Sequence, residues 1–349
     1  MDGLNIFLLI LITVILIYIL YRAITKKQEE KGNIKATPPY DDATNVTKET
    51  ELTAIENVSN GSGITSLNIT EGMPLYLRDY CIKSSSNSAY SGGYMNLNAI
   101  KYVLSRGCRF LDFEIYYKDE TPIIAYSTSA YDPSYSSFTS KGLPVSLDGV
   151  FSTILLYAFN DNAPNSSDPL FIHLRIKSHI NNAYQDIATS ASTVLKNRLF
   201  MGQVHPGTPI STLMGQIVLM VDRGTSPNYA NYPTCLPGQA NCYNLKNIIN
   251  MESGSDDVRV YKENDLTNQS INPPDPSVYM MRIVLPQVGL FGTRNCDSIY
   301  LVENYGAQMV AQAFYINDAR LAVYEDMFRT YKTAFVPIAS AVKYARSKQ

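Results

Sequence analysis

Histidine is scarce in this sequence of 349 residues, which contains His173, His179 and His205 and no other. No histidine precedes residue 173, so chemistry that needs a histidine acid or base in that part of the chain is excluded. The formal net charge is only −2. Such a balance gives no electrostatic footprint for nucleic acid, so we expect no nucleic-acid partner.

Cysteine is also sparse, with five residues at Cys81, Cys108, Cys235, Cys242 and Cys296. The spacing contains no CxxC pair and no Cys/His cluster, which argues against a structural zinc site. Two of the cysteines flank a Pro-Gly turn in CLPGQANC, where a disulfide is sterically acceptable. The alternative is that both cysteines are free thiols in a reducing compartment. Because the number of cysteines is odd, free thiols are at least as well supported as a disulfide.

One long apolar run is present, IFLLILITVILIYILY at residues 6–21, followed by Arg22, Lys26 and Lys27. Its length of about 24 Å as a helix, at about 1.5 Å per residue, is the short end of a membrane span. No basic residue precedes the run and no small-x-small cleavage site follows it, so a signal peptide fits poorly. We expect residues 1–27 to be a transmembrane anchor whose residues 6–21 contact a membrane.

The basic flank follows the apolar run, so the positive-inside rule predicts a single-pass membrane protein whose main domain faces the cytosol. Six N-x-S/T sequons argue weakly against this orientation, at Asn45, Asn57, Asn60, Asn68, Asn165 and Asn268. Residues 28–72 are polar and lack apolar periodicity, which predicts a flexible stalk. The folded domain is predicted at 73–349.

Within 73–349, strand patterns and helix patterns alternate. Strands are predicted at 109–116, 122–125, 170–176, 216–221, 278–284, 298–302 and 308–316. Helices are predicted at 147–159, 184–199 and 318–330. Recurring β-α units indicate a parallel sheet, and the length fits a closed (β/α)8 barrel.

Alternation along a strand places Asp112 and Glu114 on one face of residues 109–116. Near the end of a barrel strand, two such carboxylates could bind Ca²⁺ or Mg²⁺ or share a proton. Hydrogen-bonded acids at the barrel mouth are the plainer alternative. Arg175 shares a face with His173 on the strand at 170–176, so it could neutralise the acids as a bound cation otherwise would. His173 lies one layer deeper and is interpreted as a satisfied core histidine.

Several segments resemble phosphoinositide-specific phospholipase C. LRDYCIKSSSNSAY, GCRFLDFEIYY, ETPIIAYS, PLFIHLRI and MGQIVLMVD resemble its X region, and MRIVLPQVGLFGTRNCDS and YGAQMVAQAFYIND resemble its Y region. The resemblance implies an α/β fold with a distorted TIM-type barrel, which the transmembrane helix expected from the apolar run at 6–21 would precede. It implies an X-like half at about 77–223, a polar linker at about 224–275 and a Y-like half at about 276–349.

The resemblance also implies a damaged site, with no catalytic residue intact. The two catalytic histidines of the family fall on Ser86 and Tyr126. Its metal ligands fall on Asn87, Asp112, Glu114 and, as a cation in place of a carboxylate, Arg175. Its phosphate-binding lysines fall on Met220 and Asp222, its ring-stacking tyrosine falls on Val284, and its phosphate-site arginine is kept as Arg282.

We therefore expect a membrane-anchored phospholipase C-like barrel that has lost catalysis and has a binding or structural role with an unidentified protein partner. Its Asn/Ile/Tyr-rich composition suggests a protein of a large DNA virus, in a host or virion membrane. One alternative is a divergent phosphoric diester hydrolase acting on phosphoinositides or other lipid phosphodiesters. Another is a non-catalytic module that binds a headgroup or peptide through Arg175 and Arg282. No cofactor is expected, apart from residual Ca²⁺ at Asn87, Asp112 and Glu114.

Overall fold

The computed structural model describes residues 18, 63–70, 73–129, 131–134, 138–139, 141–161, 163–232, 235, 239, 242–267, 279–289 and 292–348. The predicted anchor at 6–21 lies outside the described residues, except for Tyr18, which is helical and exposed. None of the helices within the described ranges has the length and apolar character needed to cross a membrane. The chain divides into two units, Met1–Glu49 and Thr50–Gln349, and the fold below is that of the second.

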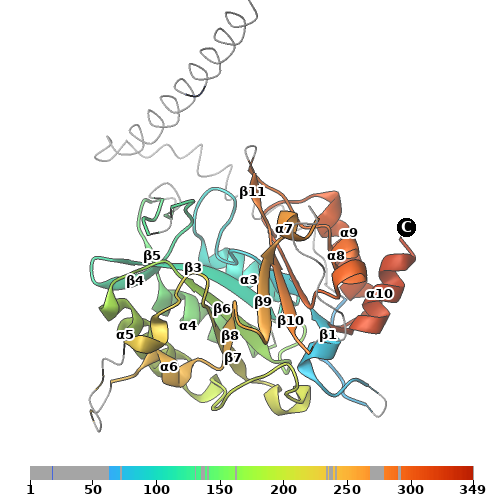
Figure 1. Ribbon diagram of the computed structural model, residues 1–349, viewed down its shortest axis with the longest axis horizontal. Coiled ribbons are helices and arrows are strands. Elements are labelled where there is room, and N and C mark those ends of the chain that lie inside the picture. The colour runs from blue at the N-terminus through green and yellow to red at the C-terminus, as the bar shows by residue number, and fades with distance from the viewer. Residues whose placement is uncertain are drawn as a thin grey trace, which may run out of the picture. The chain divides into compact units, whose positions relative to one another are not determined.

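Eight parallel strands form a nearly closed barrel, which confirms the predicted barrel architecture (Figure 1). In spatial order they are β8 (Met251–Ser253), β7 (Ile217–Asp222), β6 (Leu170–Ile176), β3 (Phe110–Lys118), β2 (Ser84–Ser85), β13 (Met309–Gln312), β10 (Met281–Leu285) and β9 (Val258–Lys262). The long strands β3, β6 and β7 are buried over almost their whole length. Burial on both faces is typical of a parallel sheet covered by helices, and it explains their apolar outward-facing residues.

Strands β8 and β9 follow each other directly and are the two ends of the ladder path. Both lie inside the segment 224–275, so the predicted polar linker is wrong for its later part. Met251 and Val258 are buried there and give the two short strands their contact with the core. The polar residues around them carry too little periodicity to reveal strands of three and five residues.

Four small antiparallel pairings between described strands supplement the barrel. They join β1 (Tyr80–Ile82) to β14 (Phe335–Pro337), β4 (Thr121–Ile124) to β3 and to β5 (Val145–Ser146), and β11 (Val288–Gly289) to β12 (Gly292–Thr293).

The α-helices are α3 (Leu97–Ser105), α4 (Leu147–Ala158), α5 (Asn181–Ser190), α6 (Leu245–Ile248), α7 (Glu263–Thr267), α8 (Ser298–Tyr305), α9 (Ala319–Tyr331) and α10 (Ile338–Arg346). Figure 1 shows α8, α9 and α10 together beside β10 and β1. Residues 298–302 belong to helix α8, so the strand predicted there is wrong. Asp297 caps this helix by accepting from the Tyr300 N–H, and Gly306 ends it in the left-handed region with φ 56°.

Short helical turns complete the connections. They are the 3₁₀ turns Leu77–Asp79, Lys196–Arg198, Ile210–Leu213 and Tyr229–Asn231 and the π turn Ala191–Leu195.

Residues 63–70 are packed against the barrel, although the sequence predicts a flexible stalk through residue 72. Ile64 and Leu67 are buried in the main core. The Leu67 N–H donates to Asp168 Oδ1 at 2.6 Å, and the Thr65 N–H donates to the Lys332 carbonyl at 2.9 Å. A Cβ at Gly107 would lie 3.0 Å from Ile64, so the glycine makes room for this side chain. The folded domain therefore includes residues 63–70, which we call the strap.

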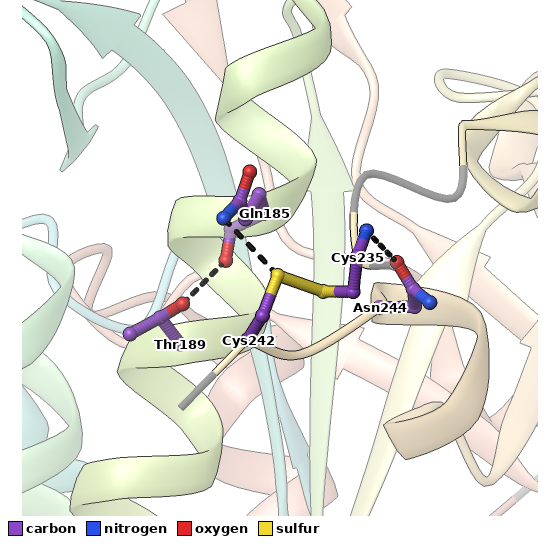
Figure 2. The surroundings of a disulfide bond; sticks show 5 residues. All are labelled: Gln185, Thr189, Cys235, Cys242 and Asn244. Carbon is purple, nitrogen blue, oxygen red and sulfur yellow. Dashed lines mark hydrogen bonds between the residues drawn. A yellow bond between two sulfur atoms is a disulfide. The ribbon is translucent and has the colours of Figure 1, made fainter. Parts of the chain in front are cut away.

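Cys235 and Cys242 are joined by a disulfide, with their Cα atoms 5.5 Å apart (Figure 2). Gln185 of α5 donates to the Cys242 sulfur at 3.4 Å, and the Cys235 N–H donates to Asn244 at 3.1 Å. Of the two alternatives left open by the sequence, the structure has the bonded one. The other three cysteines are free and buried.

Candidate binding site at the carboxyl end of the barrel

Two adjacent strands bring the predicted site residues together. In the β3–β6 ladder, Asp112 pairs with His173 and Glu114 pairs with Arg175. Because registered residues of parallel strands point to the same side, all four side chains face the barrel interior. The two acids and Arg175 thus meet near the carboxyl ends of their strands, as their spacing predicts.

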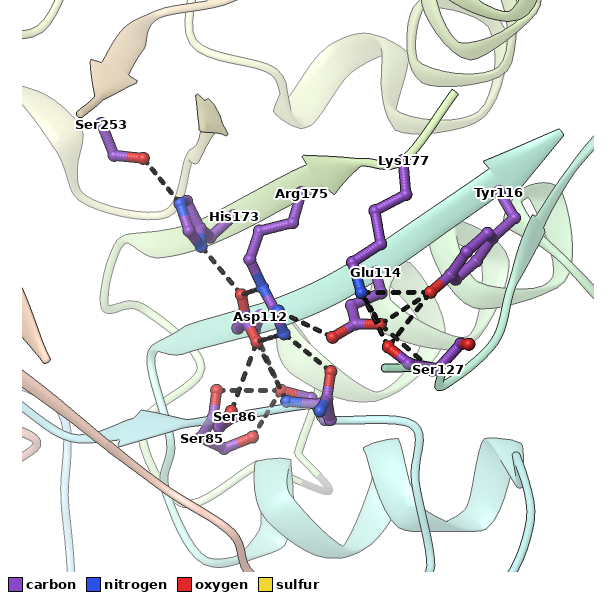
Figure 3. A network of polar contacts seen from close by, with 12 residues as sticks. Ser85, Ser86, Asp112, Glu114, Tyr116, Ser127, His173, Arg175, Lys177 and Ser253 are labelled. Atoms are coloured by element: carbon purple, nitrogen blue, oxygen red, sulfur yellow. Dashed lines mark hydrogen bonds and ion pairs between the residues drawn. The ribbon is translucent and has the colours of Figure 1, made fainter. Parts of the chain in front are cut away.

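The Arg175 guanidinium lies between Asp112 and Glu114 (Figure 3), and it bonds to all three predicted metal ligands. Its Nε donates to Asp112 Oδ1 at 2.8 Å and its Nη2 to Asp112 Oδ2 at 2.6 Å. Nη1 donates to Glu114 Oε1 at 2.7 Å, and Nη2 also reaches Asn87 Oδ1 at 2.8 Å. Such bidentate, charge-assisted contacts are the strong form of ion pair.

The protonation states follow from this pairing. Burial alone would raise the pKa of the fully buried Asp112 carboxyl, but Arg175 and His173 outweigh it and hold the pKa below its ordinary value. Burial would likewise lower the pKa of the Arg175 guanidinium, and Asp112 and Glu114 reverse this, so the pKa is raised. The pair is therefore ionised at neutral pH.

A second cation, Lys177, holds the other oxygen of Glu114. Its Nζ donates to Glu114 Oε2 at 2.8 Å, to Tyr116 Oη at 3.1 Å and to the Ser127 carbonyl at 2.9 Å. Burial lowers the pKa of Lys177, and Glu114 partly offsets the effect. Lys177 is not among the site residues predicted from the sequence. Lys177 lies two positions after Arg175 on the same strand face, a spacing that could have predicted it.

His173 lies below this layer and has a partner on each ring nitrogen. Nδ1 is 2.9 Å from Asp112 Oδ1, and Nε2 is 2.7 Å from Ser253 Oγ on β8. An ionised Asp112 only accepts, so Nδ1 carries a proton, and Ser253 Oγ also lies 3.4 Å from the Val221 carbonyl. His173 and Ser253 are 0% exposed, which keeps substrate away from this serine–histidine–carboxylate arrangement. The geometry agrees with the predicted core histidine.

A cavity of about 550 Å³ lies above the ion-pair layer. The two residues predicted at catalytic positions, Ser86 and Tyr126, both line it. Ser86 Oγ lies 3.4 Å from Asp112 Oδ2. The Tyr126 ring stacks on Tyr90 with centroids 4.9 Å apart. Neither a serine hydroxyl nor a phenol is a proton shuttle near neutral pH. Within the described residues, no histidine lines this cavity.

Comparison with known proteins agrees with this geometry. Residues 73–220 match the X domain of phosphatidylinositol-specific phospholipase C. The crystal structure of L. pealei PLC21 is similar over 76% of this chain, with a TM-score of 0.56 and 17% sequence identity. That of S. officinalis PLC21 gives the same values. No curated protein sequence matches the chain.

These findings support a PLC-like barrel fold. The chain spans only 37% of the length of either PLC21 structure.

The Ca²⁺ that the X-domain family implies does not fit the residues present. Ca²⁺ needs about six to eight oxygen ligands. Here both oxygens of Asp112, Oε1 of Glu114 and Oδ1 of Asn87 accept hydrogen bonds from Arg175. Among the residues that the structure describes, no group of three or more His, Cys, Asp or Glu side chains could hold a metal ion. The guanidinium takes the place of the cation.

The structure does not bring Arg282 to this cavity. Arg282 is the second residue of β10, near its amino end, and it lines a different cavity of about 650 Å³ with Arg78 and Tyr279. In the β10–β13 ladder Ile283 pairs with Met309, so Arg282 and Val284 have the opposite parity and point out of the barrel. Met220 is buried in the interior, whereas Asp222 lines the carboxyl-end cavity.

Proposed function

We propose that this protein is a catalytically inactive PLC-like barrel whose carboxyl-end cavity binds a ligand without turning it over. The observation that carries this proposal is the position of the Arg175 guanidinium, bonded to Asp112, Glu114 and Asn87. A fixed internal cation replaces an exchangeable metal there. It cannot replace a metal ion on a substrate phosphate, because four of its five N–H donors are already bound within the protein.

The missing acid–base groups support the same proposal. General acid–base catalysis needs a titratable group within hydrogen-bond reach of the substrate. Ser86 and Tyr126 stand where the resemblance places the two catalytic histidines, and both line the cavity. His173 is fully buried below the cavity. Both oxygens of Glu114 are occupied by ion pairs, one to Arg175 and one to Lys177. The anchoring of this barrel in a host or virion membrane, through residues 6–21, is part of the proposal.

A divergent phosphoric diester hydrolase is the competing function, and it would use Asp112 and Glu114. The full-length chain would be assayed for Ca²⁺-dependent cleavage of phosphatidylinositol and simpler phosphodiesters. An Asp112→Asn/Glu114→Gln variant and an active phospholipase C serve as controls. We expect wild type and variant to match the buffer blank. Wild-type turnover that the variant loses would overturn the proposal.

A further inference from the structure

Asp222 places a carboxylate in the wall of the carboxyl-end cavity. It is the last residue of β7 and is only 6% exposed. Its Oδ1 accepts the Gly224 N–H at 2.9 Å. Its Oδ2 takes part in no hydrogen bond or ion pair with any residue in the described ranges. One oxygen of a largely buried carboxylate is thus left for a partner from the cavity.

Two glycines keep this carboxylate uncovered. A Cβ at Gly224 would lie 3.1 Å from Asp222 Oδ1 and 3.6 Å from Oδ2. A Cβ at Gly254 would lie 3.4 Å from Asp222 Oδ1, and its φ of +72° is strained for other residues. Both glycines line the cavity. The backbone therefore forms a notch that admits a ligand group to Asp222.

The charge balance around the notch is negative. Leu174 pairs with Val221 in the β6–β7 ladder, so the next pair in register is Arg175 with Asp222. The Arg175 side chain nevertheless extends toward β3, on the other flank of β6, and binds Asp112 and Glu114 there. Together with Lys177, the layer holds three carboxylates and two cations, a net charge of −1, and Lys262 and Asp265 on the cavity wall add one charge of each sign. The excess negative charge lies at Asp222, since the other two acids are paired.

We propose that the cavity binds an amine-bearing ligand whose ammonium group docks on Asp222. This inference deepens the proposed binding function and rests on it. A phosphorylated ligand is disfavoured because Asp222 repels it and because four of the five N–H donors of Arg175 are bound within the protein. Tyr126 and Tyr315 line the same cavity and supply aromatic surface for the body of the ligand. The amine could belong to a small headgroup or to a lysine side chain.

Calorimetric titration of the full-length chain tests this inference. The probes are ethanolamine for a headgroup, N-acetyl-lysine amide for a peptide, N-acetylethanolamine as a neutral control and myo-inositol 1-phosphate as an anion. We expect at least one amine to bind and both controls to fail, with the tighter amine identifying the source. Asp222→Asn keeps the size of the side chain and should weaken amine binding about tenfold or more, because it removes a charged hydrogen-bond partner.

Asp265→Asn is the matched control, since Asp265 is an exposed carboxylate that lines the same cavity. It should change the affinity by less than about twofold, as expected for a screened surface charge. Equal losses in the two variants, tighter binding of the inositol phosphate, or no amine binding at millimolar concentration would each overturn the inference. These outcomes leave the proposed lack of catalysis intact, which only phosphodiester turnover contradicts.

Discussion

Arg175 and Asp112 lie on neighbouring strands and are joined by two hydrogen bonds of 2.8 and 2.6 Å. Asp112 is fully buried, and the Arg175 side chain is 13% exposed. A buried ion pair of this kind gains little over an apolar pair, yet it is costly to break because the remaining charge stays buried. The relationship therefore has consequences both for stability and for metal binding.

Removing the guanidinium should strongly destabilise the barrel. Arg175→Met leaves Asp112 and Glu114 close together without their shared counter-charge, at an expected cost of about 3–5 kcal/mol. Urea denaturation at neutral pH measures this change. Arg175→Met combined with Asp112→Asn should recover part of the loss, since only one carboxylate then stays.

The control for this experiment is Arg259→Met, which removes an ion pair to Asp256 of 2.6 Å between exposed side chains. It should cost less than about 1 kcal/mol, as surface pairs do. Similar losses in the Arg175 and Arg259 variants would contradict the role given to the buried pair.

Exchanging the internal cation for a carboxylate should create a metal site. Arg175→Glu adds an acidic ligand beside Asn87, Asp112 and Glu114 and frees their oxygens. Ca²⁺ should then raise the melting temperature of this variant relative to EDTA, because ligand binding stabilises the folded state by about 2.7 kcal/mol at a hundred times Kd. Arg175→Gln, neutral and similar in length, should show no such shift. An equal Ca²⁺ shift in wild type would refute the view that Arg175 replaces the metal.

The convergence of Asp112, Glu114 and Arg175 was predictable because it depends on local regularities. Strand side chains alternate with period two, and parallel strands end at the same edge of the barrel. Arg282 shows where this reasoning stops. Matching a residue to a family position shows neither which face of its strand it is on nor which end of the strand it is near. Arg282 lies near the amino end of β10, whereas the cavity lies at the carboxyl ends of the strands.

The strap and the strands β8 and β9 were missed for a different reason. Each has very few apolar residues in a polar context, so no periodic pattern forms. Leu67 packs in the main core, and its backbone N–H donates to Asp168, 101 positions away. Tertiary partners of that kind are invisible in a sequence window.

Asp168 should give the domain a pH-dependent stability. Its carboxyl is 0% exposed, and burial raises its pKa to about 6 from 3.8, despite opposing hydrogen bonds from Leu67 and Asn165 and the charge of Arg109. An acid whose pKa is higher in the folded state than in the unfolded state stabilises the fold in its protonated form. This stabilisation is complete when the pH is below the unfolded-state pKa, and it is lost as the pH rises through the folded-state pKa. Between pH 4 and pH 7 the loss amounts to about 2–3 kcal/mol.

Urea denaturation of wild type and Asp168→Asn across this range measures the effect. The variant cannot ionise at this position, so its stability relative to wild type should rise as the pH goes from 4 to 7. Parallel pH profiles for the two proteins would contradict the shifted pKa.

The strap should contribute measurably to the stability of the barrel. Leu67→Ala removes a side chain that is 6% exposed and packed in the main core, and it should cost about 2–4 kcal/mol in urea denaturation. Leu75→Ala is the matched control, because Leu75 is 60% exposed and should change stability by less than about 0.5 kcal/mol. If Leu67→Ala were as neutral as Leu75→Ala, residues 63–70 would be an ordinary stalk. A loss confined to Leu67→Ala would instead mean that a barrel cut at residue 73 lacks part of its own core.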